Sequence, residues 1–244
     1  MKINVIGTGT MGSITRGNQA ILVDDILFDC GSGVVKKLEQ MKLYTKYVNY
    51  LILTHAHSDH FCDIPNYLIG RNIRGENTQT LEIICGKGLK EKTIELFVLC
   101  FGYKGDDFDF EKSYNVHFNE LEDGDVFETD SFKLTAYELE HGPCKPILGF
   151  VLEKDGKSLG YATDTTVCDN VDKICEKSDI VFLDATNTIP TNSHMGLNEV
   201  IDYSRKYKGK DIYAIHRSDY VHNHITEIKF PEDGEEIILW WRVK

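Results

Sequence analysis

Four side chains that can bind metal ions stand within the six residues His55-Ala56-His57-Ser58-Asp59-His60. Imidazole nitrogens and carboxylate oxygens together suit zinc, manganese or iron. His55 and His57 are two residues apart in an extended chain, so their side chains point the same way and can bind one ion. Asp59 and His60 follow a bend and can point to a second ion. This density predicts a metal site rather than a chance histidine cluster.

The elements that must position this motif are expected to be strands first, then alternating strands and helices. The nearly all-apolar run 48–54 directly before the motif is typical of a strand buried on both faces. Further strands are predicted at 2–6, 19–23, 26–29, 81–85, 116–118, 125–128, 132–138, 149–153, 158–162, 180–184, 212–215 and 237–240. Helices are predicted at 34–41, 90–100, 170–176 and 198–207, and a solvated loop at 102–112. No linker divides the chain, so residues 1–244 are expected to form one α/β domain of two mixed sheets packed face to face, with helices outside.

The glycines Gly7, Gly9 and Gly12 fit the letters of a dinucleotide-binding loop and follow a predicted strand. Residues 13–18 and then another strand come next, instead of a helix. Without a helix N-terminus there is no dipole to hold a pyrophosphate, so this interpretation is rejected.

The charge and cysteine content exclude several classes of protein. The net charge of −12 argues against a broad nucleic-acid-binding surface, while a local cationic site made of metal ions remains compatible with it. No apolar run reaches the roughly 18 residues that span a bilayer, and residues 1–10 lack the layout of a signal peptide. The seven scattered cysteines, without a C-x-x-C pair, indicate reduced thiols. We therefore expect a soluble cytoplasmic protein.

The order His-x-His-x-Asp-His after a buried strand resembles the signature of the metallo-β-lactamase fold, an αββα sandwich with a dinuclear site. The later ligand loops are similar to that family in order, at 140–142 (Glu-His-Gly), 162–165 (Ala-Thr-Asp-Thr) and 214–218 (Ala-Ile-His-Arg-Ser). The resemblance implies two divalent ions, with zinc expected ahead of manganese. It implies ligands from His55, His57 and His141 for the first ion, from Asp59, His60 and His216 for the second, and from Asp164 for both.

Further segments resemble the ribonuclease Z-like phosphodiesterase branch of this fold. They are 26–31 (Ile-Leu-Phe-Asp-Cys-Gly), 182–186 (Phe-Leu-Asp-Ala-Thr) and 193–199 (Ser-His-Met-Gly-Leu-Asn-Glu). In that branch the histidine of the last segment lies beside the metals and assists the leaving group, and the resemblance implies this role for His194. Asp184 is a candidate to orient His194 or a ligand histidine, with a helix cap or a solvent-exposed group as the alternatives.

Three features depart from ribonuclease Z itself. Ser58 and Asp63 stand where that family typically has glycine. Only 22 residues separate His141 from Asp164, whereas in ribonuclease Z this interval carries a long arm that grips tRNA. Here the interval is long enough only for a loop and two strands. We therefore expect the arm to be absent.

The chemistry that the resemblance implies is phosphodiester hydrolysis. Two ions that share Asp164 would lower the pKa of a water between them, giving a bridging hydroxide that Asp59 orients and that attacks the phosphorus. His194 would protonate the departing oxygen. The acidic balance and the missing arm disfavour long nucleic acid. The predicted substrates are therefore 3′,5′-cyclic mononucleotides, as for the small arm-less phage anti-Pycsar enzymes that act against cyclic-nucleotide immune signalling. A homodimer is expected, because a single sandwich leaves the metal edge open.

Several alternatives stay open at this stage. One is a ribonuclease Z-like tRNA 3′ endonuclease. A β-lactam or thioester hydrolase is another, disfavoured by the His194 motif. A flavodiiron-type oxidoreductase would normally have glutamate at position 57 and a flavin domain. The substrate contacts stay unassigned, with candidates at Tyr67, Arg71, Arg74, Tyr103, Tyr220, His222 and His224.

Overall fold

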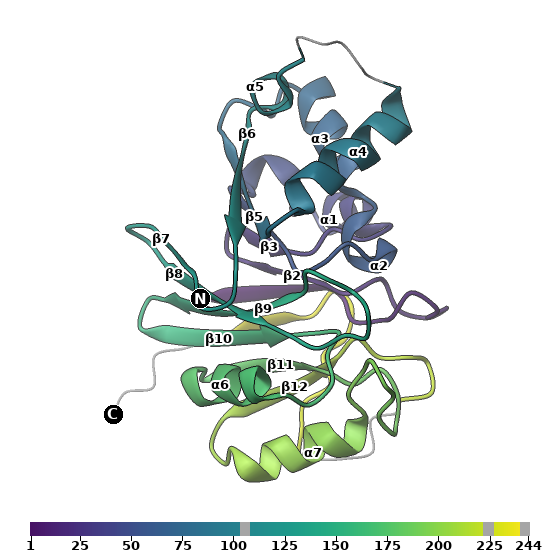
Figure 1. The fold of residues 1–244 in the computed structure, drawn as a ribbon, viewed down its shortest axis with the longest axis vertical. Helices are drawn as coiled ribbons and strands as arrows, with labels where there is room; N and C mark the ends of the chain where they lie inside the picture. Colours follow the sequence, from purple (N-terminus) through teal and green to yellow (C-terminus); the bar gives the residue numbers. More distant parts are fainter. Residues whose placement is uncertain (103–107, 222–226, 240–244) are drawn as a thin grey trace.

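The computed structural model describes residues 1–102, 108–221 and 227–239, which form two β-sheets packed face to face between helices (Figure 1). The first sheet has the strand order β13 (Glu236–Ile238), β1 (Lys2–Gly7), β2 (Ala20–Val23), β3 (Ile26–Phe28), β4 (Tyr50–Leu53), β5 (Leu81–Gly86) and β6 (Val116–Leu121). The second has the order β12 (Asp211–Ile215), β11 (Ile180–Asp184), β10 (Lys157–Ala162), β9 (Leu148–Lys154), β8 (Lys133–Glu138) and β7 (Val126–Glu128). Each sheet contains parallel and antiparallel pairs, so the predicted mixed sheets are confirmed.

Helices cover the outer faces of both sheets. The first sheet carries α1 (Val34–Gln40), the 3₁₀ turn η1 (Thr45–Tyr47), α2 (Ser58–Phe61), α3 (Ile64–Ile73), α4 (Leu89–Phe101) and α5 (Phe110–Tyr114). The second carries α6 (Asp169–Lys177) and α7 (Leu197–Lys206). Phe28, Phe150 and Phe182 are buried in the layer between the sheets, and each sheet packs a second apolar cluster against its helices. Burial of these three apolar layers stabilises the αββα order that the sequence predicts.

Three helices, α2, α3 and α5, differ from the sequence expectation. Helix α3 was not predicted, because Pro65 and Gly70 weaken the helical pattern of its sequence. Its proline lies in the first turn, where the missing N–H costs no intrahelical hydrogen bond. The expected loop 102–112 is wrong at its end, where Phe110 begins α5 and Asp109 Oδ1 accepts a hydrogen bond from the Lys112 N–H. Of the predicted strand 237–240, the last residue lies outside the described part.

The interval between His141 and Asp164 is fully described. It consists of a loop and the antiparallel hairpin of β9 and β10. The chain after β1 likewise reaches β2 without a helix, as expected. In the part of the chain that the structure describes, no helix combines the length and hydrophobicity that a membrane crossing requires.

Candidate metal centre

The predicted ligands converge at one edge of the sandwich because five of them follow the ends of strands and the other two, Asp59 and His60, lie in α2 just after β4. His55 and His57 follow β4, His141 follows β8, Asp164 follows β10 and His216 follows β12. Asp164 and His216 have positive φ angles of 54° and 53°, which are uncommon for residues with a Cβ atom. Such strained backbone is concentrated at functional sites, where the surrounding structure holds it in place.

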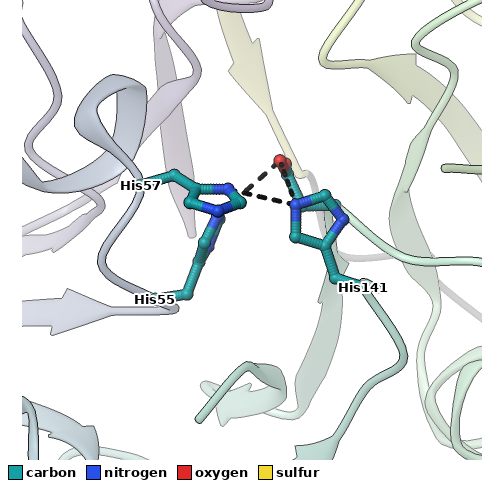
Figure 2. Close-up of side chains that lie close together, drawn as sticks. His55, His57 and His141 are labelled. Carbon is teal, nitrogen blue, oxygen red and sulfur yellow. Dashed lines mark hydrogen bonds and ion pairs between the residues drawn. The ribbon is translucent and has the colours of Figure 1, made fainter. Parts of the chain in front are cut away.

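The first cluster comprises His55, His57, His141 and one oxygen of Asp164. His57 Nδ1 lies 3.1 Å from His141 Nε2. Asp164 Oδ2 lies 3.7 Å from both His55 Nε2 and His141 Nε2. Figure 2 shows the imidazole rings of His57 and His141 close together, and their planes are nearly perpendicular, at 70°.

The second cluster comprises Asp59, His60, His216 and the other oxygen of Asp164. Asp164 Oδ1 lies 3.1 Å from His60 Nε2 and 3.3 Å from His216 Nε2. Asp59 Oδ2 lies 3.2 Å from His216 Nε2 and 3.6 Å from His60 Nε2. The two clusters therefore share Asp164, one carboxylate oxygen each.

The separations between these atoms fit a bound metal. A tetrahedral zinc with ligands at 2.0–2.1 Å holds its ligand atoms about 3.3 Å apart, within the range found in both clusters. His55 Nε2, His60 Nε2 and Asp59 Oδ1 are buried with no hydrogen-bond partner among the described residues. Buried polar atoms are normally paired, and a cation in each cluster would supply the missing partner.

In four of the five ligand histidines the second ring nitrogen is anchored by a neighbouring group. Thr54 and Thr186 donate their hydroxyl protons to Asp29 and Asp184, so their oxygens accept from the histidines. The Nδ1 contacts are His55 to Thr54 Oγ1 at 3.0 Å, His60 to Asp29 Oδ2 at 2.8 Å, His141 to the Ser193 carbonyl at 2.7 Å and His216 to Thr186 Oγ1 at 2.9 Å. With the proton on Nδ1, each Nε2 presents a lone pair to the site, as metal-binding histidines require.

Asp29 is a functional candidate that the sequence analysis did not single out. It is fully buried after β3, and its φ of 63° turns the chain there. Its Oδ1 accepts hydrogen bonds from the Thr54 N–H and hydroxyl, and its Oδ2 contacts His60. One carboxylate thus orients a histidine of each cluster, directly for His60 and through Thr54 for His55. The available signal was its place in the segment 26–31.

His194 lies beside both clusters without belonging to either tetrad. Its ring centroid is 4.5 Å from that of His141 and 5.4 Å from that of His216. Its Nδ1 is 2.8 Å from Asp184 Oδ2, and its side chain is 19% exposed. Asp184 is buried and also accepts the Thr165 N–H, so its carboxylate is fixed. This arrangement suits a group that exchanges protons with a molecule bound from solvent.

The clusters strongly perturb the acidity of their own members. Burial alone disfavours imidazolium, but Asp164 and the other carboxylates raise the pKa of His60 well above its usual value and that of His216 to about 10. Burial dominates at His55, whose pKa is lowered. Burial opposes ionisation of Asp59 and Asp164 as well, yet the histidines hold both pKa values low. Without a metal, His60 and His216 therefore balance the charge of the carboxylates as imidazolium ions, and a divalent cation would take over that role by displacing their protons.

Three of the seven residues considered for substrate contact have other roles in the structure. Tyr67 and Arg71 are buried residues of α3 itself, and the Tyr67 hydroxyl donates to the Thr45 carbonyl. Arg74 pairs with Glu39 and Glu76. Tyr220 is 82% exposed and follows the His216 loop, so it remains available. Tyr103, His222 and His224 lie outside the described residues.

The chain is similar to known proteins both in sequence and in fold. The profile described as the β-lactamase superfamily domain matches residues 24–217. The ribonuclease Z of Mycolicibacterium gilvum is 29% identical over 185 residues, which are 71% of this chain and 65% of that protein. Two solved structures share the fold over 98% of this chain. Human tRNase Z, short form, has a TM-score of 0.75 at 21% identity, with 99% of its chain covered. A diphosphatase of the PhnP family has a TM-score of 0.74 at 20% identity, with 98% covered.

The chain belongs to the β-lactamase superfamily. Its two mixed sheets, outer helices and His/Asp clusters define a hydrolase of the metallo-β-lactamase fold. Within that class its relatives are ribonuclease Z-like.

Proposed function

We propose that the protein is a phosphodiesterase that uses two divalent ions to hydrolyse small cyclic nucleotides, 3′,5′-cyclic mononucleotides to monophosphates. The observation that carries this proposal is the placement of His194, held by Asp184 and beside both clusters, where a leaving group would need a proton. The names of the relatives, ribonuclease Z, tRNase Z and a diphosphatase, support chemistry at phosphate.

The division of work among the side chains follows from their positions. His55, His57, His141 and Asp164 would hold the first ion, and Asp59, His60, Asp164 and His216 the second. Bound there, divalent ions would polarise a phosphoryl oxygen and make water a stronger acid, and zinc fits this mixed nitrogen and oxygen donor set.

Asp59 and His194 would act on the reacting atoms. Asp59 Oδ1 has no partner among the described residues and could accept a hydrogen bond from the attacking water. His194 is more exposed than the buried ligands, and its Nδ1 is held 2.8 Å from Asp184 Oδ2. It would donate its proton to the departing oxygen as general acid.

A small substrate is favoured by what surrounds the site. Arg16 is paired with Asp219, and Arg217 is fully buried, so neither offers a charge to a long polyanion. The loop and hairpin between His141 and Asp164 leave out the arm associated with ribonuclease Z. Met11 and Tyr220 are exposed on loops at this edge and suit the apolar face of a base. A second copy of the chain could cover this edge, and we include a homodimer in the proposal.

The test is a substrate panel with purified, zinc-loaded protein. It is incubated separately with cAMP, cGMP, cCMP, cUMP and a tRNA that carries a 3′ trailer, and the products are separated by chromatography. The expected result is nucleoside monophosphates and an intact trailer. An Asp164→Asn variant, which should lose activity, serves as the control for contaminating enzymes. Trailer removal with the cyclic nucleotides untouched would overturn the proposal in favour of a tRNA 3′ endonuclease.

A further inference from the structure

We propose that Asp219 is a positioning residue that holds the loop of residues 8–17, here called the β1–β2 loop, against Asp59. Asp219 itself lies outside both clusters, three residues after His216. The inference rests on the proposed function, because it gives Asp59 a role in that reaction. It concerns this chain's own contacts, and part of its test is independent of any substrate.

The carboxylate of Asp219 accepts several hydrogen bonds from the outer part of the β1–β2 loop. Its Oδ1 accepts hydrogen bonds from Ser13 Oγ and Thr15 Oγ1, both at 2.6 Å. Its Oδ2 accepts from the Ile14 N–H at 2.7 Å, and Arg16 lies 3.4 Å away. Four consecutive residues therefore depend on a single side chain that lies 206 residues away from Ser13 in sequence.

The base of the loop is fixed separately. Asp233 accepts hydrogen bonds from the Thr8 N–H at 2.9 Å and from the Gly17 N–H at 2.6 Å, so both ends of the loop are held. The Thr10 N–H donates to the Arg217 carbonyl. Loss of Asp219 would therefore release the outer part of the loop while its base stays in place.

Apolar packing contributes little to the stability of the outer part of the β1–β2 loop. Ile14 is 92% exposed and Met11 is 61% exposed. Gly12 has open space around the position of a Cβ atom. A segment with few buried apolar contacts is ordered mainly by its hydrogen bonds, and most of these end on Asp219.

The loop reaches the metal centre through a backbone group. The Met11 N–H donates to Asp59 Oδ2 at 3.1 Å, the same oxygen that lies 3.2 Å from His216 Nε2. This contact leaves Oδ1 of Asp59 as the oxygen without a partner among the described residues. The Met11 N–H thus selects one orientation of the carboxylate, and Asp219 keeps that N–H in place.

The experiment compares Asp219→Ala with Asp179→Ala. Asp179 also accepts a backbone N–H and a hydroxyl, both from Ser158, but it precedes β11, whereas Asp184 ends that strand at the metal edge. Brief trypsin digestion followed by mass spectrometry reports cleavage after Arg16. Zinc affinity is measured by competition with a chelator, and kcat and KM are measured with bis-p-nitrophenyl phosphate.

Asp219→Ala should be cleaved after Arg16 at least ten times faster than the unaltered protein. Its affinity for the more weakly bound of the two zinc ions should fall about tenfold. Its kcat should fall about ten- to hundredfold, while KM changes less than threefold. Asp219→Asn keeps one acceptor oxygen and should restore part of each property. Asp179→Ala should behave as the unaltered protein.

The outcomes separate this inference from the proposed function. An uncleaved Asp219→Ala loop, or a cleaved loop with zinc affinity unchanged, would overturn the positioning role. If the unaltered protein binds zinc but hydrolyses no phosphodiester, the proposed function fails, while cleavage and zinc affinity still decide whether Asp219 positions Asp59.

Discussion

The Nδ1 of the partly exposed His194 lies 2.8 Å from the Oδ2 of the fully buried Asp184. The carboxylate is held by the Thr165 and Thr186 N–H groups as well, so it has little freedom to follow the ring. The pair fixes the tautomer of His194 with Nδ1 protonated. The other ring nitrogen is then the one that can exchange a proton with substrate.

Replacing His194 by alanine should slow substrates with poor leaving groups. A general acid contributes about 10²- to 10⁴-fold when the departing oxygen needs a proton. We expect a loss of at least about 10²-fold in kcat with a cyclic nucleotide, and less than about tenfold with bis-p-nitrophenyl phosphate, whose leaving group departs without one. His117→Ala is the matched control, since His117 is exposed and pairs with Glu82. Equal losses with both substrates would contradict the general-acid role.

Replacing Asp59 by alanine should leave the fold intact but remove most of the activity. The side chain is a buried member of the second cluster, and we expect turnover to fall by roughly two or more orders of magnitude. Steady-state kinetics and a circular dichroism spectrum are the measurements. A folded Asp59→Ala variant with unaltered turnover would show that the attacking water is oriented by another group.

Replacing Asp29 by asparagine should weaken metal binding although Asp29 is not a proposed ligand. Asparagine would lose the charge that holds the His60 Nδ1 proton, and outer groups of this kind change metal affinity by about 10- to 100-fold. Chelator competition measures the effect. Asp25→Asn is the control, because Asp25 accepts from Asn49 in the turn before β3, at the opposite end of that strand. Equal zinc affinities for both variants would rule out this role for Asp29.

Metal binding should release protons at pH 7.5. In the metal-free site the pKa of His216 is raised to about 10 and that of His60 is raised well above its usual value, so both are protonated at this pH. A ligand histidine must be neutral, so binding displaces these protons and the apparent affinity should rise with pH up to about 10. Calorimetric titration with zinc in two buffers of different ionisation enthalpy measures the protons released. Identical heats in both buffers would contradict the assignment.

The parts of the site that follow local sequence order were predictable. Five of the seven ligands follow a strand whose apolar run is readable, and the His-x-His-x-Asp-His spacing places two ligands on each side of a bend. The contact of Asp29 with His60 was not predictable, because it depends on how the end of β3 lies beside α2. The burial of Tyr67 was not predicted because helix α3, which carries it, was not predicted. The weak helical pattern of this segment did not show which face of the helix is buried.

The contact of Asp219 with the β1–β2 loop shows the same limit. The two segments lie at opposite ends of the chain, and polar residues in loops carry no periodic signal. Only the closure of the sandwich brings them together.

The most direct test of the central claim is a count of metal ions against activity. Metal-free protein is titrated with zinc, bound metal is measured by elemental analysis, and hydrolysis of bis-p-nitrophenyl phosphate is followed at each point. Two clusters that share Asp164 predict about two ions per chain and full activity only when both are bound. Protein that takes up no metal on reconstitution, or that is equally active without it, would contradict the account.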